Sequence, residues 1–186
     1  MNFQKLIAVA VAALVATSAG TVFAASKTLD AVKSRGKIQC VVNPGLTGFA
    51  NPDDKGVWKG FDIDLCRAFA AAIFNDPKAA SFKPGTGKTR FTILRSGEAD
   101  VITRNSTWTF VRDVDLGFDF VGVNYYDGQG FMVSKDLGVK SAKELGGATV
   151  CIQTGTTTEL NLADYFRSNN MKFQPVPTED SAESRV

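Results

Sequence analysis

The sequence contains no histidine, and this absence limits the chemistry that the protein can perform. Histidine is the commonest acid–base group of enzymes and the commonest metal ligand of proteins. A Cys-x-x-Cys pair is also absent, which argues against a redox enzyme. The sequence therefore favours a protein that binds a molecule over one that transforms it, and it predicts neither a metal site nor a cofactor.

An excess of charge of one sign is missing too. Lysine and arginine number 21 and the acidic residues 19, so the formal net charge is +2. The basic residues form no stripe along the chain, and nucleic-acid binding is not expected. Apolar residues make up 44% of the 186 residues and charged residues 22%, which is typical of a globular chain with an ample core.

The first 24 residues have the pattern of an export signal. Lys5 precedes an apolar stretch from Leu6 to Ala16, and Val22-Phe23-Ala24 is a small-x-small cleavage site. The stretch is shorter than the roughly 20 residues of a membrane-spanning helix, although an uncleaved anchor is the alternative. We expect residues 1–24 to be removed from an exported protein.

Export bears on the three cysteines. In an oxidising compartment two of them are expected to pair. Cys40 ends a predicted strand and Cys66 lies early in the next predicted helix, so packing of helix on strand can bring them within bridging distance. Cys151 would then be an ordinary buried strand residue. Spacing does not determine connectivity, and three reduced core cysteines are the alternative.

Strand and helix patterns alternate in the first part of the chain. The patterns predict strands at 37–42, 80–83 and 99–103, and helices at 62–74 and 90–96, the second closed by Gly97. Such alternation indicates an α/β fold, a parallel sheet with helices on its faces. Ligands of these sheets lie at the carboxyl ends of the strands, where the loops 43–51 and 103–112 begin.

The pattern restarts beyond Asp115. Here the patterns predict three strands, at 131–134, 148–152 and 173–176. They also predict two helices, at 141–144 and 156–168. Both helices begin with capping-box spacing. This is too little material to complete a second parallel sheet. We therefore predict two lobes, 25–127 and 128–186, the second of them incomplete.

The loop after the third predicted strand carries polar groups suited to an anion. The planar fork of Arg112 matches a carboxylate, although a surface ion pair with Asp113 or Asp115 is the alternative. Thr107 and Asn105 would present a hydroxyl and an amide on one side of an extended segment, unless they cap their own backbone.

Three further residues of these loops have two interpretations each. Trp108 either forms the wall of an apolar pocket or belongs to the core. Phe49 either stacks on a ligand side chain or belongs to the core. Arg104 either lines the cleft or pairs with an acid.

Two glycine-containing loops are candidates for anion binding. Gly155-Thr156-Thr157 places free backbone N–H groups at a helix start, where the helix dipole favours an anion, and simple capping is the alternative. Pro84 to Thr89 resembles the end of a nucleotide-binding P-loop. That motif requires a glycine where Phe82 stands, so nucleotide binding is not expected.

Several segments match one family in the same order along the chain. They are the export signal and residues 60–66, 96–101, 104–109, 124–131 and 155–160. Together they resemble the periplasmic solute-binding proteins of polar amino-acid ABC transporters, and within that family the general L-amino-acid receptors. Family members usually lack the glycine pattern of residues 84–89, which we interpret as loop variation.

The resemblance implies a monomeric periplasmic receptor of type II fold, whose two lobes close on one L-amino acid and deliver it to a membrane permease. By this likeness Arg112 binds the ligand α-carboxylate with help from Thr107 and the amide of Thr157. Asn105 lies near the α-ammonium. Two aromatic residues lie near the side-chain pocket, Phe49 and Trp108.

The sequence also departs from the family. Members place an acidic residue for the α-ammonium late in the second lobe and return to the first lobe through a second hinge strand. The chain ends at Val186, before both, and is expected to be truncated. Two alternatives are an exported dehydratase-like enzyme, for which Asp127 and Glu159 are the candidate acids, and a ligand-sensing receptor segment, which needs a membrane helix downstream.

Overall fold

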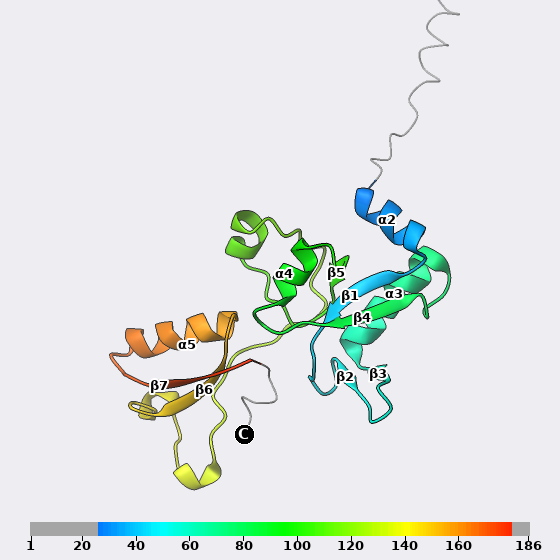
Figure 1. The fold of residues 1–186 in the computed structure, drawn as a ribbon. Helices are drawn as coiled ribbons and strands as arrows, with labels where there is room; N and C mark the ends of the chain where they lie inside the picture. The colour runs from blue at the N-terminus through cyan, green and yellow to red at the C-terminus, as the bar shows by residue number, and fades with distance from the viewer. Residues whose placement is uncertain (1–25, 180–186) are drawn as a thin grey trace, which may run out of the picture. The chain divides into compact units, whose positions relative to one another are not determined.

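Three parallel strands form the first sheet of the computed structural model, which describes residues 26–179 (Figure 1). The central strand is β1 (Ile38–Val42), which pairs with β4 (Ala80–Pro84) on one side and β5 (Val101–Ile102) on the other. A strand with a neighbour on each side is buried, and β1 is accordingly apolar along most of its length. The predicted export signal lies outside the described residues.

Helices cover both faces of this sheet. Successive side chains of a strand point to opposite faces. Cys40 and Val42 accordingly share a core cluster with α3 (Phe61–Phe74), whereas Val41 packs against Ile93 of α4 (Arg90–Arg95). Both helices were predicted, and Gly97 has the left-handed backbone expected beyond the end of α4, with φ +75°.

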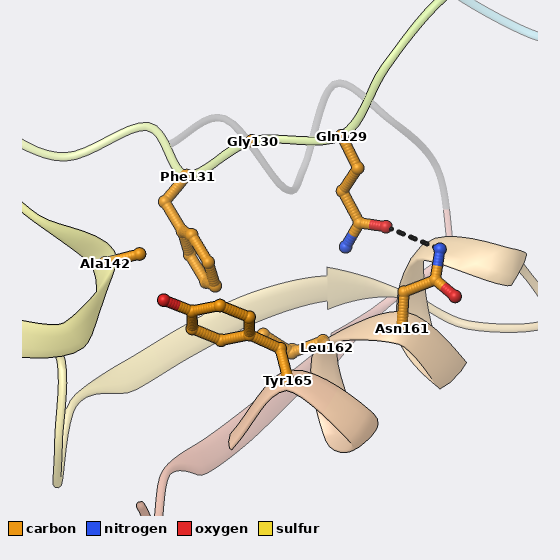
Figure 2. A pocket seen from close by; sticks show the side chains of 7 residues that line it. All are labelled: Gln129, Gly130, Phe131, Ala142, Asn161, Leu162 and Tyr165. Carbon is orange, nitrogen blue, oxygen red and sulfur yellow. Dashed lines mark hydrogen bonds between the residues drawn. The ribbon is translucent and has the colours of Figure 1, made fainter. Parts of the chain in front are cut away.

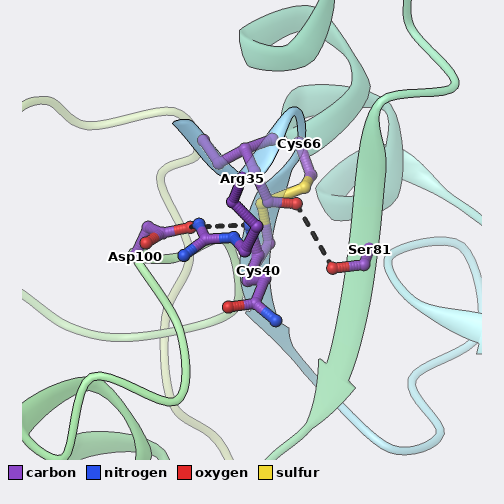
Figure 3. Close-up of a disulfide and its surroundings, with 7 residues drawn as sticks. Arg35, Cys40, Cys66, Ser81 and Asp100 are labelled. Atoms are coloured by element: carbon purple, nitrogen blue, oxygen red, sulfur yellow. Dashed lines mark hydrogen bonds and ion pairs between the residues drawn. A yellow bond between two sulfur atoms is a disulfide. The ribbon is translucent and has the colours of Figure 1, made fainter. Parts of the chain in front are cut away.

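The predicted disulfide joins Cys40 to Cys66 and so links β1 to α3 (Figure 3). The two Cα atoms lie 6.2 Å apart and both residues are fully buried. The alternative of three reduced cysteines is therefore wrong. Cys151 is free, but it is only half-buried and not buried as predicted.

A half-buried carboxylate holds the edge of the first sheet in place. Asp100 precedes β5, accepts a hydrogen bond from the backbone N–H of Gln39 at 2.8 Å, and forms an ion pair with Arg35 (Figure 3). Arg35 is the last residue of α2 (Lys27–Arg35), a helix that the sequence patterns did not predict. The contact connects α2, β1 and β5.

The loop after β1 is more ordered than its glycines and prolines suggest. Within it β2 (Asn51–Pro52) pairs antiparallel with β3 (Trp58–Lys59), and Leu46 forms a bridge with Ala50. The loop is attached to the start of α3, where the N–H of Asp62 donates to the Phe49 carbonyl at 2.9 Å. Phe49 is therefore held by backbone hydrogen bonds.

A second parallel sheet follows, with β6 (Thr149–Gln153) paired to β7 (Gln174–Thr178). Leu162 and Phe166 of α5 (Thr157–Ser168) form its core with Ile152. The other elements of the described chain are short turns of helix, which are η1 (Val111–Asp115), η2 (Lys135–Leu137) and η3 (Ala142–Glu144).

The prediction of a strand at 131–134 is wrong. Residues 131–134 take no strand conformation, and Phe131 instead packs edge-on against Phe166, with ring centroids 6.0 Å apart. A strand needs a neighbour for its backbone hydrogen bonds, and no strand within residues 26–179 pairs with this segment.

Over the described residues, both parallel sheets belong to one compact unit that begins at Val32, within α2. Over residues 26–179, none of the helices combines the length and the apolar character that crossing a membrane requires.

We expect the disulfide to contribute about 3–4 kcal/mol to the free energy of unfolding, because it closes a long loop in the unfolded chain. Reduction with dithiothreitol should lower the denaturant midpoint of the wild type by a corresponding amount. The Cys151→Ser variant is the control and should respond to reduction as the wild type does. An unchanged midpoint after complete reduction would contradict the prediction.

Candidate functional site

Three strand ends of the first sheet are joined at its carboxyl edge, where a ligand site was predicted. Asn43 follows β1 and donates through Nδ2 to Asn105 Oδ1 at 3.0 Å, connecting the loops after β1 and β5. Arg104 donates through Nη1 to the carbonyl of Gly85, which follows β4, and through Nη2 to Asn105 at 2.9 Å. These hydrogen bonds tie together the loops that follow β1, β4 and β5.

Asn105 lies at this edge, and its side-chain oxygen is engaged within the protein. Its Oδ1 accepts from both Asn43 and Arg104, and an amide oxygen has two lone pairs. In this arrangement Asn105 offers a ligand only its NH₂ group. A hydrogen-bond donor does not suit the α-ammonium to which the resemblance assigned this residue.

Arg112 is buried in η1, with 8% of its surface exposed. Its Nη1 donates to the backbone carbonyl of Thr107 at 2.7 Å, and its guanidinium lies 5.2 Å from the centroid of the Phe91 ring. Burial lowers the pKa of Arg112. The alternative ion pair with Asp113 or Asp115 is not present, and within residues 26–179 no carboxylate pairs with this guanidinium.

Thr107 connects Arg112 to the start of α5. The hydroxyl oxygens of Thr107 and Thr157 lie 3.1 Å apart, within hydrogen-bond distance across 50 residues of sequence. The three residues to which the resemblance assigned the α-carboxylate are thus adjacent, and Thr107 is exposed whereas Thr157 is half-buried.

The start of α5 is capped as its spacing predicted. Thr156 Oγ1 accepts from the N–H of Glu159 at 3.2 Å, and Glu159 Oε2 accepts in return from the N–H of Gly155 at 2.9 Å. The N–H of Gly155 is therefore engaged in the cap, contrary to the expectation that it is free for a ligand. Thr157, the first residue of the helix, is the member of this motif that meets Thr107.

The two candidate aromatic residues are both outside the fully buried core. Phe49 is half-buried and makes edge-on contacts with Phe61 and Tyr125, at centroid distances of 6.1 and 5.1 Å. Trp108 is 48% exposed, which excludes the core alternative. Its ring stacks on Phe120 at 5.3 Å and its Nε1 donates to Asp113 at 2.6 Å.

Asp62 and Arg104 are buried charges that affect each other electrostatically and form no ion pair. Burial raises the pKa of Asp62 to about 6, against the opposing effect of the Arg104 charge. Burial lowers the pKa of Arg104 to about 10, and the Asp62 charge opposes that shift. Arg104 thus neither lines an open cleft nor forms a close ion pair, and its main contacts are backbone and amide oxygens.

Arg90, the first residue of α4, is a buried cation that the sequence patterns did not single out. It is 1% exposed, and burial followed by the charges of Arg104 and Arg112 lowers its pKa to about 9. Its Nη2 donates to the Gly155 carbonyl at 3.3 Å. The sequence did contain one indication of this. A positive charge at the start of a helix interacts unfavourably with the helix dipole, so an arginine at that position suggests a stabilising contact elsewhere in the fold.

The loop Pro84–Thr89, interpreted as simple variation, makes a close backbone contact. A Cβ on Gly87 would lie 2.5 Å from the carbonyl oxygen of Thr154, and one on Gly155 would lie 3.1 Å from the Gly87 backbone. Only glycine at position 87 permits this approach. The loop therefore lies directly against the residues that lead into α5.

A separate pocket of about 470 Å³ lies beside α5 (Figure 2). It is lined by residues between 129 and 165, and none of the predicted site residues is among them. Asn161 donates to Gln129 Oε1 at 3.0 Å, and Gln129 Nε2 donates to the Thr158 carbonyl at 3.0 Å. Because these amides already bond to partners, the pocket offers mainly the apolar surfaces of Phe131 and Tyr165.

Among residues 26–179, no group of three or more cysteine, aspartate or glutamate side chains is placed to hold a metal ion.

Residues 38–180 match the family described as bacterial extracellular solute-binding proteins, family 3. The chain belongs to this family. It is 61% identical over 177 residues to the glutamate/glutamine/aspartate/asparagine-binding protein BztA of Rhodobacter capsulatus, a match that covers 95% of this chain and 51% of that protein. It is 55% identical over 180 residues to the general L-amino acid-binding periplasmic protein AapJ of Rhizobium johnstonii, covering 97% of this chain and 52% of that one.

The fold of this solute-binding protein agrees with a solved relative, an ABC transporter/periplasmic binding protein from Brucella ovis with glutathione bound. The TM-score is 0.81 at 56% sequence identity, over 86% of this chain and 50% of that one. The predicted family, the α/β fold with parallel sheets and the preference for a binding protein over an enzyme are confirmed. The chain spans about half the length of the relatives it matches.

We expect Gly87→Ala to loosen the contact between the 84–89 loop and the start of α5, because the added Cβ would meet the Thr154 carbonyl. Overpacking of this kind costs about 1–3 kcal/mol. Hydrogen exchange of the first amides of α5 should become faster. Gly122→Ala is the matched control, since a Cβ there meets nothing within 4 Å. Equal exchange in the two variants would count against the contact.

We expect Asp62→Asn to become more stable relative to the wild type as the pH rises. The folded-state pKa of Asp62, about 6, lies above its ordinary value of 3.8, so its ionisation between these values destabilises the fold. The variant cannot ionise, and the difference in the free energy of unfolding between pH 4 and pH 7 should reach about 2–3 kcal/mol. Urea denaturation at both pH values measures it. Asp54→Asn, at an exposed position, is the control, and a difference that is independent of pH would refute the expectation.

Proposed function

We propose that this protein is the amino-acid-binding component of a periplasmic ABC uptake transporter. In this proposal two lobes, 25–127 and 128–186, grip the α-carboxylate and α-ammonium of an L-amino acid, and the monomeric receptor delivers it to the membrane permease. In this proposal a signal peptide directs the receptor to the periplasm and is cleaved off near Ala24. Family membership and the name of AapJ, a general L-amino acid-binding periplasmic protein, support the proposal.

The observation that carries the proposal is the state of Arg112. Its guanidinium is buried beside Thr107 and has no carboxylate partner among the described residues. A buried guanidinium is stabilised by an anion that accepts two of its N–H groups in parallel. The α-carboxylate common to all amino acids fits this requirement, which accounts for binding that does not depend on the side chain.

The contact between Thr107 and Thr157 supports a grip by two parts of the chain. Thr107 follows the first sheet and Thr157 begins the helix of the second, and their hydroxyls lie 3.1 Å apart. A ligand carboxylate that bonds to both would stabilise the arrangement in which they are close. Hinge closure of this kind is general for periplasmic binding proteins as a class.

The ammonium and side-chain ends of the ligand are assigned with the help of the resemblance. Asn105 is placed near the α-ammonium end, where it supports the loop through its bonds to Asn43 and Arg104. The counter-charge of the ammonium is expected from an acidic residue in a later segment of the family fold. Phe49 and Trp108 are placed at the side-chain pocket, and Gly155 positions Thr157 through the α5 cap.

We expect Arg112→Met to abolish ligand binding by the protein made from this sequence. The wild type should melt at a higher temperature with millimolar L-amino acids present, and the variant should show no such shift, because loss of a charge-assisted carboxylate contact weakens binding about 100-fold or more. Thermal melts with and without ligand measure the effect.

The matched control is Arg167→Met, since Arg167 is exposed and pairs with Asp164 on α5. This control should keep the full ligand-induced shift. A wild type without any shift, or an Arg112→Met variant that retains it, would refute the proposed function.

A further inference from the structure

The loop Pro84–Thr89, which follows the first sheet, packs against the residues that follow β6 of the second. A Cβ on Gly87 would lie 2.5 Å from the Thr154 carbonyl oxygen and 3.2 Å from the Cγ2 atom of Thr156. On the opposite side, Gly155 has φ +72°, a left-handed backbone that favours glycine, and a Cβ there would lie 3.1 Å from the Gly87 backbone. Two glycines therefore make this contact, and neither position has room for a side chain.

Two polar interactions span the same contact. The Nζ atom of Lys88 lies 3.8 Å from Oε1 of Glu179, the residue after β7. The carbonyl of Gly155 accepts a hydrogen bond of 3.3 Å from Arg90, the first residue of α4. Backbone packing, an ion pair and a hydrogen bond thus act between the same two parts of the chain. All of their atoms belong to the protein, so these interactions do not require a ligand.

Each side of the contact is held in shape by its own hydrogen bonds. Within the loop, the N–H of Thr86 donates to Thr89 Oγ1 at 2.9 Å, and the N–H of Thr89 donates to Thr86 Oγ1 at 3.3 Å. Beyond β6, the N–H of Thr154 donates to the Thr178 carbonyl at 3.0 Å. Because both sides are ordered before they meet, the contact loses little conformational entropy when it forms.

The contact lies beside the residues proposed to bind the ligand. Thr157 follows Gly155 by two positions, and its hydroxyl lies 3.1 Å from that of Thr107. The Thr107 carbonyl in turn accepts from Arg112, to which the α-carboxylate is assigned. An interaction that holds Gly155 against the loop therefore favours the arrangement in which Thr157 and Arg112 can bind one carboxylate.

We propose that the 84–89 loop, through Gly87 and Lys88, is a latch that sets the affinity of the receptor without touching the ligand. This inference rests on the proposed function, in which an amino acid binds between two lobes that close on it. Because the latch stabilises the closed arrangement, a larger fraction of the free receptor is competent to bind, and the apparent affinity rises in proportion to that fraction. The latch contacts only protein, so it raises the affinity for every L-amino acid by the same factor.

Gly87→Ala tests the latch, because the added methyl group would push the loop away from Thr154. Isothermal titration calorimetry should show L-glutamate and L-glutamine losing affinity by the same factor, at least about fivefold. Gly146→Ala is the matched control in the turn before β6, since a Cβ there would lie 4.0 Å from the Met171 side chain, an ordinary contact. It should leave both affinities within about twofold.

Lys88→Glu provides a second test at an exposed position, in case the alanine variant does not fold. It places two negative charges at the ion pair with Glu179 and should weaken the binding of both ligands about two- to fourfold. The double variant Lys88→Glu/Glu179→Lys restores opposite charges and should recover the wild-type affinities.

Fluorescence energy transfer measures closure directly, with dyes on Asp54→Cys and Lys143→Cys in a Cys151→Ser background. Without ligand, Gly87→Ala should lower the transfer relative to its parent, and saturating glutamate should restore it. Unchanged transfer and affinities in Gly87→Ala, or an affinity loss confined to one ligand, would overturn the latch while leaving the role of Arg112 intact. A wild type that binds neither ligand would refute the proposed function itself.

Discussion

The burial of three guanidiniums at one edge of a sheet is the constraint around which the site is organised. Removing a charged group from water costs several kcal/mol unless other groups compensate. Here part of the compensation is internal, from backbone carbonyls at Gly85, Thr107 and Gly155 and from the face of Phe91. The remainder is what the proposed anionic ligand would supply, so in this proposal the feature that opposes stability also selects the ligand.

The buried guanidiniums are held on a part of the fold that is cross-linked at several points. The disulfide fixes α3 to the central strand, and the ion pair of Arg35 with Asp100 fixes the edge next to β5. The amide bond between Asn43 and Asn105 then joins the loops that leave this sheet. Because the support is cross-linked at several points, the buried charges cannot easily escape to water by local movement.

The family, the α/β class and most elements could be predicted from the sequence, because each depends on neighbours in the chain. The capping box at the start of α5 is one example, since its two hydrogen bonds, both made by Glu159, lie within five consecutive residues. The strand predicted at 131–134 failed because strands depend on distant partners. The hydrogen bonds of Asn105 and Arg90 could not be predicted for a similar reason, since they reach Asn43 and Gly155, 62 and 65 positions away.

The sequence by itself determined which chemical groups were available, namely hydroxyls, an amide and guanidinium forks without any histidine, and it determined the local elements that carry them. Only the tertiary structure decided which guanidiniums are buried and which lack a carboxylate. The physical reason is that desolvation and pairing depend on every group within a few ångströms, whatever its distance in the chain. Arg90, Arg95 and Arg112 carry the same side chain, and only the fold separates the exposed Arg95 from the two that are buried.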